Sequence, residues 1–195
     1  NNKNTWLVDS NGKKTKMGGY SVKAIVEDKN GDLLIGTWSS GLLRLHRGSH
    51  TFLRYPVLNS MNSAYSLFFD SKQRLWVGTW GYGVIRLDNP GDVRNPKIYK
   101  YPYKTNHFDI FYKITEDPVT HTLWACTREG VCYIYESQLD NGWQMHTMIG
   151  DNALNFNNDI ASDGHGNIWL CTQNNGIVQV NTTPSPFVIS HLDTN

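Results

Sequence analysis

Apolar and polar residues alternate along short segments of this chain, each of the length of a β-strand. Four alternating segments end at an aspartate, at residues 21–28, 64–70, 111–117 and 158–163. After a turn, each is followed by a more apolar run, at residues 33–37, 75–79, 123–127 and 168–172. Alternation bounded by Gly, Asn and Asp is typical of antiparallel strands joined by tight turns. The pattern therefore predicts an all-β chain.

The same unit occurs four times at a regular spacing. A third strand is expected at 42–45, 84–87, 131–134 and 177–180, and a fourth at about 52–55, 97–101, 143–148 and 187–191. The second strands end at threonines spaced 42, 48 and 45 residues apart: Thr37, Thr79, Thr127 and Thr172. A period of roughly 40–50 residues is typical of a four-stranded propeller blade. The sequence predicts a β-propeller segment of four four-stranded antiparallel blades, at about residues 20–57, 62–102, 109–149 and 157–192.

The segment at about residues 5–17 resembles the third and fourth strands of a blade without the first two. It predicts an N-terminal half blade, and the C-terminal residues supply no inner strands to complete it. We therefore expect the four blades to be part of a larger ring. Otherwise the end blades must pair with another copy, because open sheet faces and edges are liabilities.

Repeated positions within the blades have a structural explanation. The aspartate at the end of each first strand can accept backbone N–H groups and close the following turn, so four aspartates in this pattern do not indicate catalysis. Trp76, Trp124 and Trp169 occupy one position of the second strand and are expected in the core. Two residues later comes a small residue, which suits closely stacked blades: Gly36, Gly78, Cys126 and Cys171.

A family resemblance rests on two of these units. Residues 75–88, Leu-Trp-Val-Gly-Thr-Trp-Gly-Tyr-Gly-Val-Ile-Arg-Leu-Asp, and more distantly 22–45, resemble the two-component regulator propeller repeat. The sequence departs from that repeat at Leu34, Cys126 and Cys171, and in a turn one residue shorter before Gly130. The resemblance implies the periplasmic sensor region of a hybrid two-component histidine kinase, and many such sensors respond to oligosaccharides. Kinase activity would lie in segments absent here, as would any contact with the membrane.

One edge of the predicted blades collects candidate binding residues. Strands alternate in direction, so the turns after the second strands share an edge with the connections between blades at 58–62, 104–107 and 151–158. Binding residues concentrate on loops held by a rigid scaffold. Aromatic rings suit the apolar faces of sugars, and amides and Arg suit their hydroxyls; the candidates are Trp38, Trp80, Tyr82, Arg128, Gln173 and Asn174. Trp38 and Trp80 could instead pack between neighbouring blades.

Composition narrows the function further. The net charge is +1 with Lys and Arg spread along the chain, so nothing indicates nucleic-acid binding. The histidines lack metal-ligand spacing, and no catalytic motif or cofactor fingerprint occurs, so we expect no catalytic residue, metal or cofactor. Cys126 and Cys132 could face each other across a hairpin, but a buried free thiol is favoured at Cys126 over a disulfide.

The sequence thus favours a non-enzymatic, periplasmic, ligand-sensing propeller segment with an oligosaccharide ligand. Two other functions stay open. One is a structural segment that mediates receptor dimerisation or protein contacts without a ligand of its own. The other is a lyase or hydrolase, which would need an acid–base pair at the ring centre.

Overall fold

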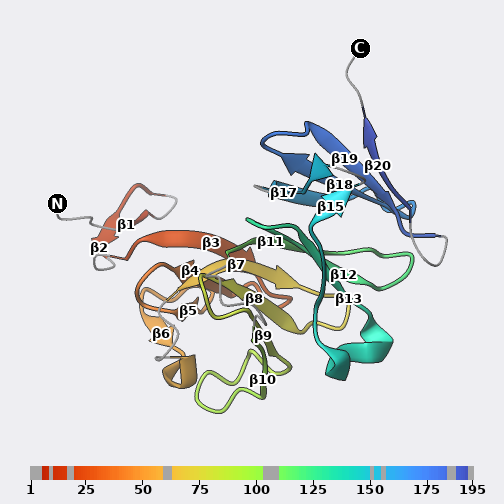
Figure 1. Ribbon diagram of the computed structural model, residues 1–195. Coiled ribbons are helices and arrows are strands. Elements are labelled where there is room, and N and C mark those ends of the chain that lie inside the picture. The colour runs from red at the N-terminus through yellow and green to blue at the C-terminus, as the bar shows by residue number, and fades with distance from the viewer. Residues whose placement is uncertain are drawn as a thin grey trace.

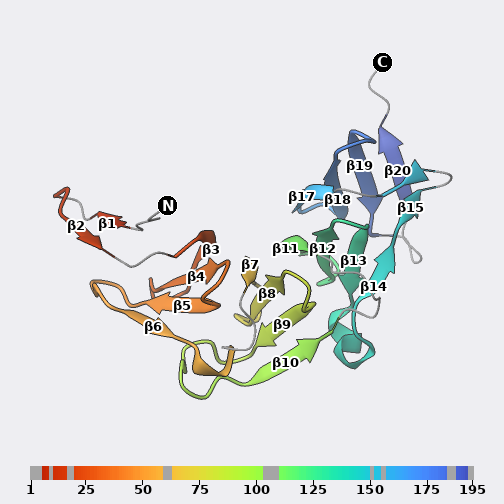
Figure 2. The ribbon, with the colours of Figure 1, turned by 60° about the vertical axis from the view of Figure 1, so that its left-hand side comes forward.

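Four antiparallel sheets of four strands each follow one another along an arc (Figures 1 and 2). The computed structural model describes residues 6–8, 11–16, 20–58, 63–102, 110–149, 152–154, 157–183 and 188–192. We call the sheets blades 1 to 4. Their strands, in chain order, are β3 (Val22–Glu27), β4 (Leu33–Thr37), β5 (Leu42–Leu45) and β6 (Phe52–Arg54); β7 (Ala64–Phe69), β8 (Leu75–Thr79), β9 (Val84–Leu87) and β10 (Ile98–Tyr101); β11 (Phe111–Glu116), β12 (Leu123–Thr127), β13 (Val131–Ile134) and β14 (Gln144–His146); and β17 (Asn157–Ser162), β18 (Asn167–Thr172), β19 (Ile177–Asn181) and β20 (Val188–Leu192). The predicted all-β fold of four four-stranded blades is confirmed.

Shorter elements surround the blades. Strands β1 (Trp6–Val8) and β2 (Lys14–Lys16) form an antiparallel hairpin within the segment predicted as a half blade, of which residues 5, 9–10 and 17 lie outside the described residues. Its membership of a blade stays a prediction. A second small hairpin joins β15 (Met148–Ile149) to β16 (Asn152–Ala153). Two 3₁₀ helices, η1 (Pro56–Leu58) and η2 (Glu136–Asn141), follow β6 and β13.

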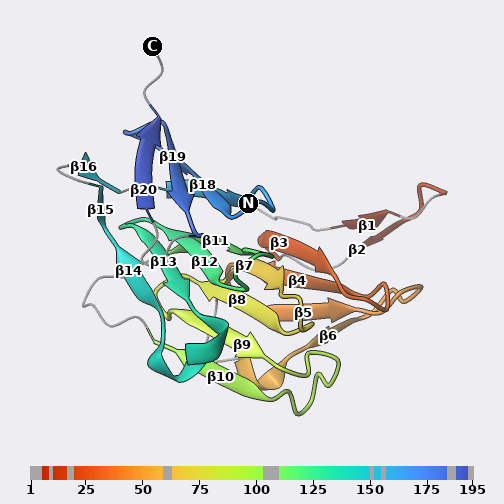
Figure 3. The ribbon, with the colours of Figure 1, turned by 90° about the vertical axis from the view of Figure 1, so that its right-hand side faces the viewer.

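The first strand of each blade is the inner one, and β3, β7, β11 and β17 succeed one another in contact (Figures 2 and 3). The last three also lie on the second strand of the preceding blade: β7 on β4, β11 on β8 and β17 on β12. The approach is close: a Cβ atom on Gly36 would lie 2.5 Å from the carbonyl oxygen of Ala64, and one on Gly78 would lie 2.9 Å from that of Phe111. The small residues on the second strands therefore permit the blades to stack, as expected.

Each first strand ends in the predicted carboxylate turn. Oδ1 of the aspartate accepts the backbone N–H two residues later, at 2.9 Å for Asp28, 3.0 Å for Asp70, 3.2 Å for Asp117 and 2.8 Å for Asp163. In blades 2 and 4 the other carboxylate oxygen also accepts the indole N–H of the following strand, at 2.7 Å from Trp76 and 3.2 Å from Trp169. The aspartates are structural, because their oxygens are occupied by these turns.

The three tryptophans of the second strands occupy the same register but differ in burial. Trp76 and Trp124 are fully buried, and each packs in a cluster with residues of the next blade. Trp169 is only half-buried. Burial at this position therefore depends on the sheet that follows, and the expectation of a core residue holds only in part for Trp169.

The two cysteines of blade 3 do not face each other. Cys126 pairs with Val131 and Cys132 pairs with Ala125, so the juxtaposition that the sequence left open is excluded by one residue of register. A shift of one residue between antiparallel strands places side chains on opposite faces. Neither cysteine forms a disulfide and both are buried, as favoured for Cys126, and burial raises the pKa of Cys126 to about 12.

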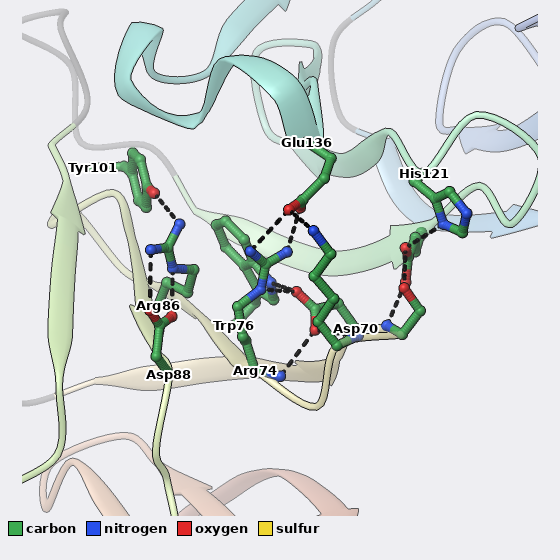
Figure 4. Close-up of polar contacts among 11 residues, drawn as sticks. Asp70, Arg74, Trp76, Arg86, Asp88, Tyr101, His121 and Glu136 are labelled. Atoms are coloured by element: carbon green, nitrogen blue, oxygen red, sulfur yellow. Dashed lines mark hydrogen bonds and ion pairs between the residues drawn. The ribbon is translucent and has the colours of Figure 1, made fainter.

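Ionic contacts hold neighbouring blades together. Between blades 2 and 3, the guanidinium of Arg74 donates to Asp70 at 2.6 Å and to both carboxylate oxygens of Glu136, which begins η2 (Figure 4). Lys72 also pairs with Glu136. Burial opposes ionisation of Glu136, but the hydrogen bonds from Arg74 and Lys72 prevail and lower its pKa.

A second ionic cluster joins blade 1 to blade 2. Arg44 is buried, donates to Asp28 and Asp32 at 2.7 Å each, and reaches the carbonyl oxygen of Pro90 in the β9–β10 connection at 2.9 Å. The hydrogen bond from the backbone N–H of Arg47 has the largest effect on the pKa of Asp32. Together with the hydrogen bonds from Arg44 and His46, it outweighs the opposing effect of burial and lowers this pKa to about 2. These contacts fix the relative position of the blades that carry the candidate site.

Candidate ligand-binding edge

The turns after the second strands are held by their threonines. In blade 1, the backbone N–H and the hydroxyl of Thr37 both donate to the carbonyl oxygen of Gly41, at 3.0 and 2.8 Å. Thr79 makes the same pair of bonds to Gly83 at 3.1 and 2.7 Å. Because the residue after each threonine begins a turn closed in this way, Trp38 and Trp80 leave the sheet edge in fixed and equivalent positions.

A β-bulge at the start of every first strand supplies further side chains to this edge. The register shifts between Val22 and Ala24, and at the corresponding place in the other three blades. A bulge inserts an unpaired residue and redirects its side chain, and bulges are common beside binding sites. The bulged residues of the four blades are Lys23, Tyr65, Tyr112 and Asn158.

Rings from the turns and the bulges meet in one cluster. The centroids of Trp38 and Trp80 lie 4.6 Å apart, edge to face, and Tyr65 lies 6.4 Å from Trp38 and 5.9 Å from Trp80. Tyr65 also contacts Tyr112 at 5.7 Å. The ammonium of Lys23 lies 5.3 Å from the Trp38 ring and 5.4 Å from the Tyr65 ring, within cation–π distance. We call these five residues, Lys23, Trp38, Tyr65, Trp80 and Tyr112, the axial cluster.

The axial cluster is packed and accessible at once. Trp38 and Trp80 contact each other across blades 1 and 2, as the packing alternative expected, yet 39% and 37% of their surfaces stay exposed. The backbone of Trp80 also forms an isolated bridge with Ile110, which leads into blade 3. Rings that are held from one side and open on the other can stack on a ligand without reordering first.

The structure brings together two of the six predicted site residues, Trp38 and Trp80. The other four are exposed and lie in the corresponding turns: Tyr82 in blade 2, Arg128 in blade 3, and Gln173 and Asn174 in blade 4. Of the blade connections predicted to share this edge, residues 59–62, 104–107, 151 and 155–156 lie outside the described residues.

Sequence analysis missed Lys23, Tyr65 and Tyr112. A signal was present, because each stands five residues before the aspartate that ends its strand. Simple alternation assigns such a residue to one face of a regular strand, and only the bulge shows that it points to the edge instead.

A separate cavity of about 530 Å³ lies between the outer parts of blades 2 and 3. Tyr101, Phe111 and Trp143 line it, with Leu139 and Met145. None of the predicted site residues is among its lining. Within the described residues, no group of three or more His, Cys, Asp and Glu is placed to hold a metal ion, and no helix is long and apolar enough to span a membrane.

Comparison with known proteins identifies the repeat. The family model described as "two component regulator propeller" matches residues 16–39 and 58–81, which enclose the first strands of blades 1 and 2 and the turns that carry Trp38 and Trp80. These two segments of the chain are similar to two-component regulator propeller repeats. The match falls on the two units in which the sequence most resembles the family. A search of curated proteins finds no match to the chain.

Solved structures support the propeller fold. The chain superimposes on the extracellular domains of two hybrid two-component systems of B. thetaiotaomicron, BT3049 and BT4673, with TM-scores of 0.68 and 0.67 and 22% identity to each. The two superpositions include 97% and 91% of this chain, but the chain spans only 27% and 26% of those domains. An inactive virginiamycin B lyase of Staphylococcus aureus, solved with quinupristin, gives a TM-score of 0.70 at 15% identity, over 100% of this chain and 64% of the lyase. At these identities the likeness concerns the fold alone.

Proposed function

We propose that this propeller segment is the ligand-sensing part of an extracytoplasmic two-component sensor, and that it binds an oligosaccharide at the axial cluster. The regulator propeller repeats in blades 1 and 2 and the likeness to extracellular domains of hybrid two-component systems support the sensor role. The periplasm is the corresponding location.

One observation carries the assignment of the site. Two half-exposed indoles and Tyr65 converge at a single edge, and the turns of blades 3 and 4 add a guanidinium and amides to that edge. Ligand sites are typically lined by aromatic rings with a few polar groups that fix orientation. Pyranose rings match this arrangement, since their C–H faces stack on indole and their hydroxyls pair with Arg128, Gln173 and Asn174.

The test is a titration of intrinsic tryptophan fluorescence with oligosaccharides of defined composition, including plant and host glycans. A saturable change is expected with at least one class. Trp80→Ala should weaken binding by roughly tenfold or more, or about 1.4 kcal/mol. Trp6→Ala is the matched control, because Trp6 is 48% exposed on β1, outside the axial cluster. Equal affinities of both variants, or no binding by the wild type, would refute the proposal.

The lyase alternative has one feature in its favour besides the fold. Lys113 and Asp159, on the inner strands of blades 3 and 4, form an ion pair of 2.6 Å, and about half of each side chain is exposed. General acid–base catalysis would need one member of this pair to exchange a proton with the substrate. Cleavage of a polysaccharide by the wild-type chain, lost in Lys113→Met, would favour an enzyme over a sensor.

A further inference from the structure

The connection between the third and fourth strands of blade 3 departs from the repeat. It contains η2, whereas the same connection in blade 1, residues 46–51, has no helix. Glu136 ties the start of η2 to blade 2 through Arg74 (Figure 4). Residues of η2, β10 and β14 together line the cavity of about 530 Å³. The regular repeat of the blades therefore does not account for this cavity.

The apolar walls of the cavity are held in place from behind. Its lining includes the rings of Tyr101, Phe111 and Trp143. Tyr101 stacks on the buried Trp76 with ring centroids 5.6 Å apart, and Trp143 meets Trp76 edge to face at 5.8 Å. Trp143 also contacts Phe111, at 6.3 Å. Because these contacts fix the rings, the cavity is formed before a ligand enters. Its volume is within the range of about 300–1,000 Å³ that is typical of small-molecule sites.

One polar group of the lining is a hydroxyl that can donate a hydrogen bond. The hydroxyl oxygen of Tyr101 accepts a hydrogen bond from Arg86 at 2.9 Å (Figure 4). Burial raises the pKa of Tyr101, and the charge of Asp140 adds to the rise, so the hydroxyl keeps its proton at neutral pH. A tyrosine hydroxyl both accepts and donates, so its proton can go to a second partner.

A carboxylate on the lining is the matching acceptor. Asp140 belongs to η2 and is exposed, and among the described residues no hydrogen bond or ion pair occupies its carboxylate. Lys100 also lines the cavity and carries the opposite charge. Arg86 is paired with Asp88 at 2.7 Å. The charges around the cavity therefore balance, which favours a neutral ligand.

We propose that this cavity binds a neutral phenolic compound of one or two rings. The aromatic ring lies among Tyr101, Phe111 and Trp143, where edge-to-face and offset contacts are favourable. The phenol oxygen accepts the Tyr101 proton, and the phenol hydroxyl donates to Asp140. An apolar ring with a single hydroxyl satisfies both groups. A pyranose would instead bury several hydroxyls against the rings without partners, each at a cost in free energy.

This site is separate from the axial cluster. None of the five axial-cluster residues lines the cavity, which lies at the internal junction of blades 2 and 3. Binding of a phenol here does not require binding of an oligosaccharide there, so either proposal can fail without the other.

The test is an NMR titration of the full chain, labelled with ¹⁵N at tryptophan, with two probes. 2-Naphthol carries the rings and the hydroxyl, whereas 2-methoxynaphthalene has no hydroxyl proton to donate. 2-Naphthol should shift the indole signal of Trp143 saturably and leave those of Trp38 and Trp80 in place. 2-Methoxynaphthalene should bind roughly tenfold more weakly, because it cannot donate to Asp140.

A substitution identifies the partner of the phenol hydroxyl. Asp140→Ala should weaken binding of 2-naphthol roughly tenfold and leave binding of 2-methoxynaphthalene unchanged. Asp92→Ala is the matched control, because Asp92 is also exposed in a connection between third and fourth strands but does not line the cavity. Its affinities should equal those of the wild type.

Three outcomes overturn the proposal. The first is the absence of a shift at Trp143 with 2-naphthol, and the second is equal affinity of the wild type for the two probes. The third is equal weakening of both probes by Asp140→Ala, as a purely structural effect of the substitution would give.

Discussion

Removal of the Asp70 carboxylate should test how strongly the carboxylate turns depend on burial. Asp70 is 2% exposed and accepts four hydrogen bonds. Its Oδ1 accepts the backbone N–H groups of Lys72 and Arg74 at 3.0 and 2.9 Å, and its Oδ2 accepts Nε of Arg74 at 2.6 Å and Nε1 of Trp76 at 2.7 Å. Asp70→Ala leaves these donors buried without that acceptor.

The size of the effect follows from the partners that stay behind. Breaking a buried ion pair by removing one member costs about 3–5 kcal/mol. Arg74 keeps its bonds to Glu136, which places the expected loss near the lower limit, at about 3 kcal/mol. For a domain of this length, each kcal/mol lowers Tm by about 2–4 °C, so the midpoint should fall by about 6–12 °C.

The fold supplies its own control in blade 4. Asp163 also accepts four hydrogen bonds, from the backbone of His165 and Asn167, the Asn167 amide and the Trp169 indole, but it is exposed to solvent. Water can replace the lost acceptor there, so Asp163→Ala should destabilise much less. Thermal and urea unfolding followed by circular dichroism would measure both variants. Equal losses would refute the reasoning, since the two sites accept the same number of bonds but differ in burial and in the ion pair that Asp70 makes with Arg74.

Three further predictions concern pH, thiol reactivity and packing. The pKa of Asp32 is lowered from 3.8 to about 2 in the folded protein. The stability that its ionised form contributes is therefore complete above pH 3.8 and is lost as the pH falls through 2. Asp32→Asn should flatten the dependence of Tm on pH in that window. Cys126 should not react with a disulfide reagent in the native protein, because burial raises its pKa to about 12, whereas the exposed Cys171 should react. If the folded Cys171→Ser variant still reacted rapidly, this expectation would be contradicted. Gly78→Ala should cost about 1–3 kcal/mol in urea unfolding, because its Cβ would lie 2.2 Å from Oγ of Ser66 in the same blade and 2.8 Å from Cβ of Phe111 in blade 3. Gly91→Ala, with no atom nearer than 4.0 Å, should change stability by less than about 0.5 kcal/mol. Similar values for the two variants would contradict this close packing around Gly78.

Features determined within one repeat could be predicted from the sequence, and features determined between repeats could not. The aspartate turns and the threonine-anchored hairpins depend on residues a few positions apart, so their pattern identified them. The half-burial of Trp169 depends on whether another sheet covers it, which its own repeat does not encode. The same holds for the cavity beside Trp143, which requires η2 and two blades together.

The candidate site illustrates the same division. Trp38 and Trp80 follow the anchor threonines directly, so their edge could be inferred from strand direction. Tyr65 was assigned to a regular strand, and its redirection by a bulge needed the register of the pairing. The pairing of Cys126 and Cys132 could not be decided from the sequence for the same reason, because alternation gives the faces of each strand but not how two strands align.

The most direct test of oligosaccharide binding at the axial cluster follows the indole N–H signals of the seven tryptophans. In a protein labelled with ¹⁵N at tryptophan, single substitutions assign each signal, and an oligosaccharide is then titrated in. The signals of Trp38 and Trp80 should shift saturably and together, while those of buried Trp76 and Trp124 stay in place. Shifts confined to Trp143, or no shift with any of the oligosaccharide classes tested, would contradict binding at the axial cluster.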